Sequence, residues 1–363
     1  VQNGDFSQIG SEEVTNGNFS QEGSELVTNG DFATDSDWTI TNNVGSSTNI
    51  SGGSLNIITD GAYTQAAQNN ILTSGKSYVL TYTITSNSVV GSLSIVRGSS
   101  SSVVPSTVGT HSFYFESDGG GFAFKRGGGA LNISIDNVSV KEVGQDWTLG
   151  TGWSIGDDKA ICDGTANEAI FQANNFIDGK SYKITFDILD YTSGELICRF
   201  NSNETNTFNS VGSHTLYFTS DNSFDYVYFK SQSNFIGSVT NISVKEVGQN
   251  WTLQNGWSIG NDVAIFNGTA SAYRTIYQEN ILTVSNKYRL TFDIVSISLG
   301  SIENISQSNP ISYNTIGTKT EDFIATNASL FLKPTTTSDL TIDNISVIEI
   351  TDDTNLPRIN YSG

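Results

Sequence analysis

A twenty-residue stretch near the middle of the chain recurs almost unchanged, and its spacing sets the size of the folding unit. Residues 137–156 read NVSVKEVGQDWTLGTGWSIG and residues 241–260 read NISVKEVGQNWTLQNGWSIG, identical at 16 of 20 positions. A partial third copy, NISVIEI, occupies residues 344–350, so the copies begin 104 and then 103 residues apart. Solenoid repeats are about 20–50 residues long, so this period predicts whole domains joined head to tail.

The repeat divides the chain into three domains and two terminal pieces. Unit one is expected at residues 27–143, unit two at residues 144–247 and unit three at residues 248–350. Each copy of the stretch ends one unit and begins the next, so no flexible linker is expected between them. Because the chain contains no methionine, residue 1 is not expected to be a translation start, and the chain is either processed or part of a longer protein. Residues 351–363 are expected to be a linker to a further domain.

Apolar residues alternate with polar ones at the same place in every unit. A period of two indicates a strand with one face in a core and one in solvent. Many short strands, separated by turns rich in Gly, Asn and Ser, indicate an all-β fold of two packed antiparallel sheets. The alternating residues are Tyr78, Leu80, Tyr82 and Ile84, then Tyr182, Ile184, Phe186 and Ile188, then Tyr288, Leu290, Phe292 and Ile294.

The first 26 residues contain a shorter repeat, VQNGDFSQIGSEE followed by VTNGNFSQEGSEL, and VTNGDF then begins unit one. Each copy looks like the first strand of a domain, detached from the rest. A lone strand is not stable in water. We therefore expect these strands to dock on the edge of a neighbouring subunit's domain, or on matching strands of other copies. The alternative is a flexible linker.

The charge of the chain excludes some classes of partner. Thirty-seven acidic and 17 basic residues give a net charge of −20, which repels nucleic acid and anionic membrane surfaces. No apolar run reaches the roughly 18 residues of a membrane-spanning helix, so no membrane insertion is expected.

Nothing in the sequence indicates catalysis. His111 and His214 stand at equivalent positions where unit three has Lys319, which favours a structural or solvated side chain over a catalytic one. Motifs of nucleophilic, zinc or phosphate chemistry are absent, and no carboxylate pair stands out. Cys162 aligns with Phe266 of unit three, so it and Cys198 are interpreted as buried thiols, with a disulfide as the alternative.

Several motifs together resemble carbohydrate-binding modules of families four and nine and their jelly-roll relatives. They are V-T-N-G-D-F at the start of unit one, Asp37-Trp38, G-K-x-Y before a long strand, and the final I-D-N-V-S-V. The resemblance covers most of residues 27–350 and implies three tandem antiparallel jelly-roll β-sandwiches. VTNGDFATDSDW, GTGWSIGDDKA, VKEVGQ and residues 354–361 are also similar to stretches of bacteriophage tail-fibre and other virion proteins.

Glycan binding, which the resemblance implies, depends on exposed flat aromatic rings. Alternation around Val227 and Phe229 places Tyr226, Tyr228 and Lys230 outward, and Tyr217 alternates in the same way. Unit two is therefore the expected binder, the alternative being that these tyrosines pack against a neighbouring domain or subunit. The tryptophans near the junctions are expected to hold junction or core together; they are Trp147, Trp153, Trp251 and Trp257.

The resemblance also implies a structural Ca²⁺ ion between the first segment of a domain and its last strand. Unit one offers Asp31 and Asp136, which are oxygen donors of the kind that Ca²⁺ takes. Unit two has Thr240 in place of Asp136, and unit three keeps Asp343 but lacks the N-G-D-F opening. A site is therefore expected in the first jelly roll only, and the alternative is that each carboxylate satisfies its own turn.

These features predict a non-enzymatic structural or adhesion protein of an extended extracellular or virion fibre, of the phage tail-fibre kind, in contact with surface glycans. Its expected partners are a surface polysaccharide and either other virion proteins or further copies in a homo-oligomer such as a trimer. One alternative is the accessory glycan-binding region of a secreted bacterial polysaccharide-degrading enzyme. The other is a structural spacer without a ligand.

Overall fold

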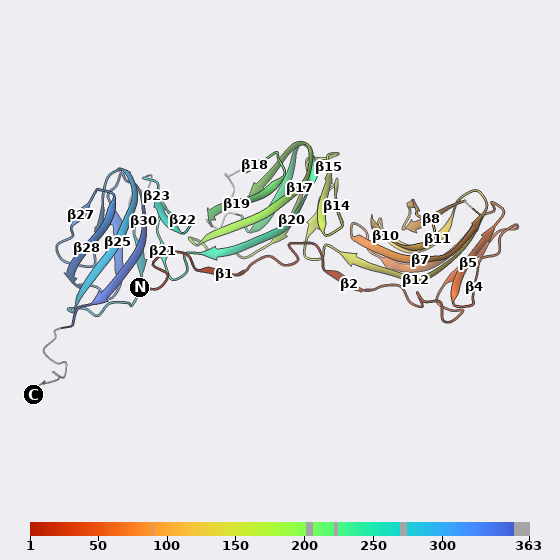
Figure 1. The fold of residues 1–363 in the computed structure, drawn as a ribbon, viewed down its shortest axis with the longest axis horizontal. Helices are drawn as coiled ribbons and strands as arrows, with labels where there is room; N and C mark the ends of the chain where they lie inside the picture. Colours follow the sequence, from red (N-terminus) through yellow and green to blue (C-terminus); the bar gives the residue numbers. More distant parts are fainter. Residues whose placement is uncertain (90, 201–205, 221–223, 269–273, 352–363) are drawn as a thin grey trace, which may run out of the picture.

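The computed structural model describes residues 1–89, 91–200, 206–220, 224–268 and 274–351, and the tail motif at residues 354–361 lies outside them. All regular elements in the described part are β-strands, and all their pairings are antiparallel, which confirms the all-β prediction. The strands form three sandwich domains in a row (Figure 1), each around its own apolar core. The chain is thus a tandem array of jelly-roll β-sandwiches.

Units one and three each consist of two five-stranded layers, and in unit one a strand from the N-terminal segment adds to the first layer. In unit one the first layer consists, in spatial order, of β10 (Gly109–Glu116), β7 (Ser77–Val89), β12 (Leu131–Val143), β5 (Ser54–Thr59) and β4 (Asn49–Ser51), and β2 (Glu22–Glu25) pairs with β12. The second layer consists of β3 (Thr39–Asn42), β6 (Thr64–Leu72), β11 (Gly120–Gly128), β8 (Ser92–Arg97) and β9 (Ser101–Val104). In unit three the two layers are β28 (Gly317–Ile324), β25 (Lys287–Leu299), β30 (Asp339–Glu349), β23 (Val263–Phe266) and β22 (Trp257–Gly260), and β21 (Thr252–Leu253), β24 (Ile276–Gln278), β29 (Leu330–Pro334), β26 (Ile302–Asn304) and β27 (Ser312–Tyr313).

Unit two has the same arrangement, but two long strands run through both layers and join them into one sheet. β17 (Ser181–Arg199) takes the places of β7 and β8, and β20 (Tyr226–Val247) takes those of β11 and β12. The other strands of this sheet are β1 (Ile9–Glu12), β13 (Thr148–Leu149), β14 (Trp153–Gly156), β15 (Lys159–Asp163), β16 (Ala169–Ala173), β18 (Asn206–Phe208) and β19 (Gly212–Thr219).

The alternating residues of the three long strands point into the cores, as the sequence predicts. Tyr78, Tyr182 and Tyr288 begin these runs, and every residue of the three runs is at most 4% exposed. Cys162 and Cys198 are buried and unbridged, which confirms their interpretation as apolar core residues.

The histidines of units one and two have a structural role. Their ring nitrogens bind carbonyl oxygens of the preceding turn, His111 that of Thr107 at 2.6 Å and His214 that of Ser210 at 3.2 Å. Lys319 donates to the carbonyl of Ile316 at 3.2 Å in unit three. The equivalent position therefore secures the same turn in all three units.

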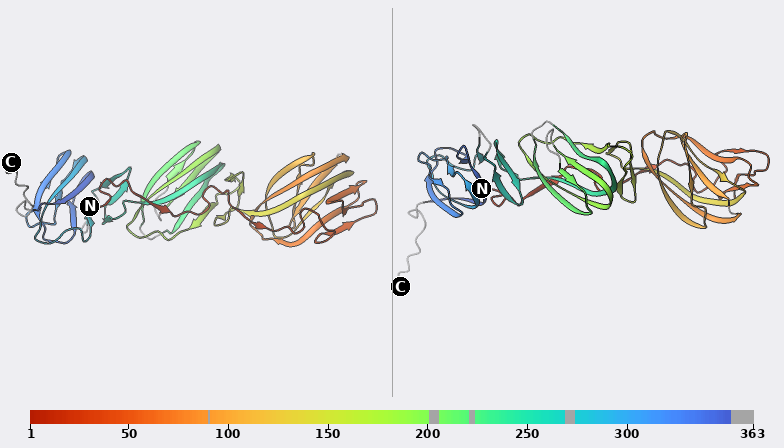
Figure 2. Two further views of the ribbon diagram at one scale, coloured as in Figure 1. Left: turned by 60° about the horizontal axis from the view of Figure 1, so that its bottom comes forward. Right: turned by 90° about the horizontal axis from the view of Figure 1, so that it is seen from above.

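The N-terminal residues 1–26, here called the strap, dock on the three units of the same chain, with one copy of the opening segment on unit three and one on unit two. Residues 1–6 lie on unit three and residues 14–19 on unit two, while residues 27–32 belong to unit one (Figures 1 and 2). Docking was predicted, but the surface lies within the chain and not on another subunit. The segments supply the opening that units two and three lack, so each of them completes a domain of the same chain.

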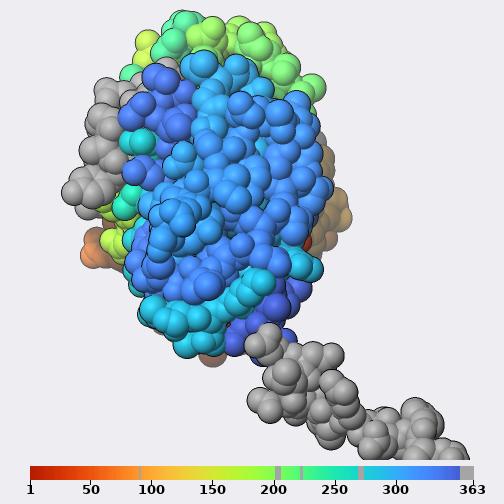
Figure 3. Space-filling model, turned by 90° about the vertical axis from the view of Figure 1, so that its left-hand side faces the viewer, coloured from red at the N-terminus to blue at the C-terminus, as the bar shows by residue number. Residues whose placement is uncertain are grey.

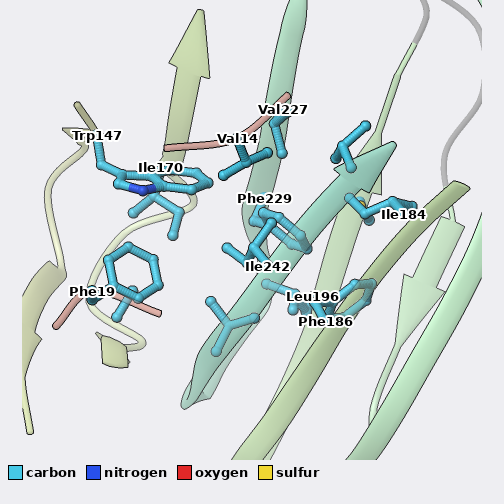
Figure 4. Packing of buried hydrophobic residues seen from close by; sticks show 14 of the residues in the cluster. Val14, Phe19, Trp147, Ile170, Ile184, Phe186, Leu196, Val227, Phe229 and Ile242 are labelled. Carbon is cyan, nitrogen blue, oxygen red and sulfur yellow. The ribbon is translucent and has the colours of Figure 1, made fainter. Parts of the chain in front are cut away.

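Each of these three opening segments holds its phenylalanine against a tryptophan of the unit it completes. Phe6, Phe19 and Phe32 are each 1% exposed. Their ring centroids lie 5.5, 5.2 and 5.4 Å from those of Trp251, Trp147 and Trp38, respectively. Figure 4 shows Phe19 and Val14 among the core residues of unit two, with Trp147 beside them. Trp153 and Trp257 are also buried, so the tryptophans hold the cores together as predicted.

The backbone of each opening segment fits against a bulge in the last long strand of its unit. That strand contains an asparagine with positive φ, at Asn137, Asn241 and Asn344. The N–H of the next residue then points out of the ladder and donates to the segment's glycine, from Ile242 to the Gly17 carbonyl at 2.9 Å in unit two. A Cβ on Gly17 would lie 1.9 Å from the carbonyl oxygen of Ile242, so only glycine fits there.

Two glutamates fix the strap between its docked segments. The Glu12 carboxylate accepts hydrogen bonds from the N–H of Val244 at 2.7 Å and the hydroxyl of Ser243 at 2.6 Å. Glu25 binds Val140 and Ser139 of unit one in the same way. The short strands β1 and β2 pair beside these contacts with the ends of β20 and β12. The strap is therefore bonded along units two and one.

The junctions between units are formed by the same contact twice. The ring of Tyr114 in unit one lies against Gly156 of unit two, and the ring of Tyr217 in unit two lies against Gly260 of unit three. Seen from the end of unit three, the other two units lie mostly behind it (Figure 3). The units thus follow one another along a single axis, and the N-terminus lies beside β21 of unit three, the last sandwich in the sequence (Figure 1).

Replacing Phe19 by alanine should destabilise unit two and spare unit one, although unit one follows Phe19 directly in the sequence. Truncating a buried phenylalanine costs about 3–5 kcal/mol. Hydrogen exchange followed by mass spectrometry on the full chain should show faster exchange in the core strands of unit two. Phe6→Ala is the matched control and should affect unit three in the same manner. Faster exchange in unit one for either variant would contradict this assignment of the strap.

Candidate functional site: an aromatic face on unit two

A group of aromatic side chains lies on the outer surface of one layer of unit two. Tyr226 and Tyr228 alternate with the buried Val227 along β20, as the sequence predicts, and Tyr226 is 39% exposed. Tyr228 pairs across the sheet with Phe171 of β16, and their rings stack with centroids 6.2 Å apart. The Tyr226 ring meets that of Phe171 edge-on at 5.4 Å.

Phe224 and Arg199 complete this group, which we call the aromatic face (Phe171, Arg199, Phe224, Tyr226, Tyr228). The Phe224 ring lies 5.3 Å from that of Tyr226 and 5.5 Å from that of Tyr228. The guanidinium carbon of Arg199 lies 4.6 Å from the centre of the Phe224 ring. Partial burial raises the pKa of Tyr228, which Arg199 opposes, so the hydroxyl stays neutral and can donate hydrogen bonds. Lys230 follows on the same side of β20 and is half-buried.

Alternation along one strand could not reveal Phe171 and Phe224. Phe171 lies on β16, and its position beside Tyr228 depends on the register between β16 and β20. The aligned sequence of unit three does contain a signal for this aromatic pair. Unit three has Tyr277 paired with Phe331 at the same place, with ring centroids 5.0 Å apart. Unit one has two alanines there, Ala67 and Ala123.

Tyr217 lies apart from the aromatic face. It stands on β19, which pairs with the first half of β17, whereas Tyr228 lies opposite Arg199 at the end of β17. Its ring packs on unit three and lines a cleft of about 460 Å³ at the junction, together with Leu253 and Trp257. The alternative interpretation from the sequence, packing against a neighbouring domain, describes this tyrosine.

The proposed calcium ligands each bind their own turn. A carboxylate oxygen of Asp31 accepts from the N–H of Ala33 at 3.3 Å, and one of Asp136 from the N–H of Asn137 at 2.7 Å. Ca²⁺ takes six to eight oxygen ligands. Within the described residues no group of three or more His, Cys, Asp or Glu side chains is arranged to hold a metal ion.

The reason given for restricting calcium to unit one is wrong. Asp5 of the strap stands in unit three where Asp31 stands in unit one, so unit three also has both carboxylates. Burial raises the pKa of Asp343, and the charges of Asp293, Asp5 and Asp262 raise it further. Calcium binding at Asp31 and Asp136 stays a prediction.

Hydrogen exchange of the full chain, compared in Ca²⁺ and in chelator, tests this prediction. Slower exchange in unit one is expected when Ca²⁺ is present.

The comparisons with known proteins found a distant structural similarity. No protein-family model and no curated protein matches the chain. Among solved structures, the chain is similar to the N-terminal CBM22-1–CBM22-2 tandem domain of Paenibacillus barcinonensis Xyn10C. The two share 10% sequence identity with a TM-score of 0.27, over 62% of this chain and 99% of that chain. In the described part of the chain, no helix is long and apolar enough to span a membrane.

Asp343→Asn should stabilise unit three at pH 7 in the presence of chelator. A carboxyl group whose folded-state pKa is raised destabilises the fold above that pKa, and the penalty disappears as the pH falls through it towards the unfolded value. The amide keeps an oxygen for the Asn344 N–H, now bound at 2.7 Å, and removes the repulsion. We expect a gain on the order of 0.5 kcal/mol, or roughly 2–4 °C in the melting temperature of unit three.

Asp322→Asn is the control for this measurement. Asp322 accepts two hydrogen bonds from Arg289, at 2.8 and 3.1 Å, which keep the pKa of its carboxyl group low. Its loss should lower the melting temperature of unit three or leave it unchanged. Calorimetry at pH 4 and pH 7 separates the two cases, because the gain from Asp343→Asn should shrink at the lower pH. A lower melting temperature for Asp343→Asn at pH 7 would refute the repulsion.

Proposed function

We propose that this chain is a non-catalytic, glycan-contacting part of an extended fibre, at a virion surface or outside a cell. The aromatic face of unit two carries this proposal. Flat rings bind pyranose sugars through the apolar C–H faces of the sugar, and neighbouring polar groups bind its hydroxyls. Tyr226 and Tyr228 provide both ring and hydroxyl, and Lys230 and Arg199 add donors at the edges.

The shape of the aromatic face suits an extended polymer better than a small enclosed ligand. Its rings lie on the outside of a layer, on neighbouring strands, and Tyr226 is the most exposed member. A second aromatic pair, Tyr277 and Phe331, occupies the equivalent layer of unit three and is half-buried. Two modest sites on one rigid array would bind a polysaccharide with gain from avidity.

The arrangement of the units supports the fibre part of the proposal. Three sandwiches follow one another without an intervening linker, and the strap is bonded to the second and third of them. Such an array would hold the aromatic face of unit two at a fixed distance from either end of the row of units. Its acidic charge of −20 would favour neutral or basic surface polysaccharides over strongly anionic ones.

A glycan array probed with the full chain tests this function. Tyr226→Ala combined with Tyr228→Ala should weaken binding about tenfold. Each aromatic contact contributes about 0.5–1.5 kcal/mol beyond its burial, and 1.4 kcal/mol is a factor of ten. Neither side chain belongs to the core clusters, so the array should stay folded.

Tyr217→Ala is the matched control, since its ring contacts Gly260 at the junction and not the aromatic face. It should leave glycan affinity unchanged. Equal binding by the wild type and the double variant would remove the aromatic face as the site. Absence of binding by the wild type to any neutral or basic polysaccharide would leave a structural spacer as the function.

A further inference from the structure

The three grooves that hold the opening segments are copies of one recognition site. In each, the indole N–H of a tryptophan donates to the carbonyl oxygen of the segment's asparagine, at 2.9 Å for Asn3, 3.0 Å for Asn16 and 3.1 Å for Asn29. The phenylalanine N–H closes a turn onto the same carbonyl at 3.1–3.3 Å. The segments read VQNGDF, VTNGNF and VTNGDF, so the grooves accept nearly identical peptides.

The grooves read the segment mostly through its backbone. In unit two the side-chain amide of Gln172 accepts from the N–H of Thr15 at 2.9 Å and donates to its carbonyl at 2.9 Å. Gln278 and Gln68 make the same pair of bonds to the second residue of the other two segments. Backbone bonds of this kind do not depend on which side chain the segment carries.

The segments differ at two exposed positions, where the groove makes few side-chain contacts: the Thr28 hydroxyl lies 3.4 Å from Gln68, and the charge of Asp5 acts on Asp343. Their second residue is Gln or Thr and their fifth is Asp or Asn, and both positions are exposed in all three copies. The glycine faces a carbonyl oxygen that a Cβ would approach to about 2 Å in every unit. The phenylalanine fills the pocket beside the tryptophan. The valine packs against the core of its unit in all three copies. The selective positions are therefore the valine, the asparagine, the glycine and the phenylalanine.

We propose that the grooves of units two and three are peptide-binding sites selective for a V-x-N-G-x-F segment. The segment of a second copy of this chain fits them as well as the chain's own does. Nothing in the groove distinguishes the two, because the second copy carries the same segment sequences. This inference does not depend on glycan binding.

Tethering decides which segment occupies a groove in the dilute protein. A segment on the same chain has an effective concentration in the millimolar range when its connection is short. A segment in solution competes only when the groove has lost its own. Exchange between copies is therefore expected when a segment is displaced, with its tether released or its glycine altered.

The full chain with Gly17→Ala provides an open groove, because the added Cβ would meet the carbonyl oxygen of Ile242 at 1.9 Å. The probe is a fluorescent peptide of residues 14–26. We expect it to bind this variant at one site and to slow hydrogen exchange in unit two. It should bind the wild type at least tenfold more weakly, because the wild-type groove is filled. The same peptide with Gly17→Ala is the control and should not bind.

A second arm avoids any failure of the variant to fold. A protease site inserted between the exposed residues Ser7 and Gln8 allows the chain to fold before its first segment is cut free. A labelled peptide of residues 1–7 should then enter unit three of the cut chain and not of the uncut chain. Equal binding of the glycine and alanine peptides, or no uptake by the cut chain, would overturn the proposal.

Discussion

The contact between a phenylalanine of an opening segment and a tryptophan of its unit is the interaction on which this array depends. All three phenylalanines have a positive φ of 50–57°, a conformation that costs a residue with a side chain roughly 1–2 kcal/mol. Nearly complete burial of the ring offsets this strain, since it stabilises by about 1.5–3 kcal/mol. Without that contact, the turn at the asparagine and the bonds of the glycine would lose the apolar side chain that anchors them in the groove.

The sequence was sufficient to predict the sandwich fold, because it depends on local alternation. Tyr78, Leu80 and Tyr82 point inward for the same reason that Tyr226 and Tyr228 point outward. Alternation reports the face of a strand and not the layer in which the strand lies. Tyr217 therefore could not be separated from Tyr226 by sequence, although one lies at a junction and the other on an open face.

The destination of the strap was harder to predict, for a physical reason. The three segments bind through backbone atoms and through the same aromatic ring, so their sequences do not show which unit each segment completes. The number of segments nevertheless matched the number of incomplete units, since two units lack an opening segment and the strap contains two. The order of pairing is reversed, with the first segment on the last unit. That order follows from the path of the chain, because the strap and the row of three units run in opposite directions.

This reversed pairing imposes a waiting time during synthesis. Phe6 is made before the other two phenylalanines, but its groove is complete only when Ile345 has been added, 339 residues later. At about 5–20 residues per second, that interval is roughly 20–70 s. Unit one can complete itself first from its own residues, whereas the first segment must pass the newly formed groove of unit two before its own exists. Correct assembly thus requires that the second segment, which lies closer along the chain, reach the groove of unit two before the first.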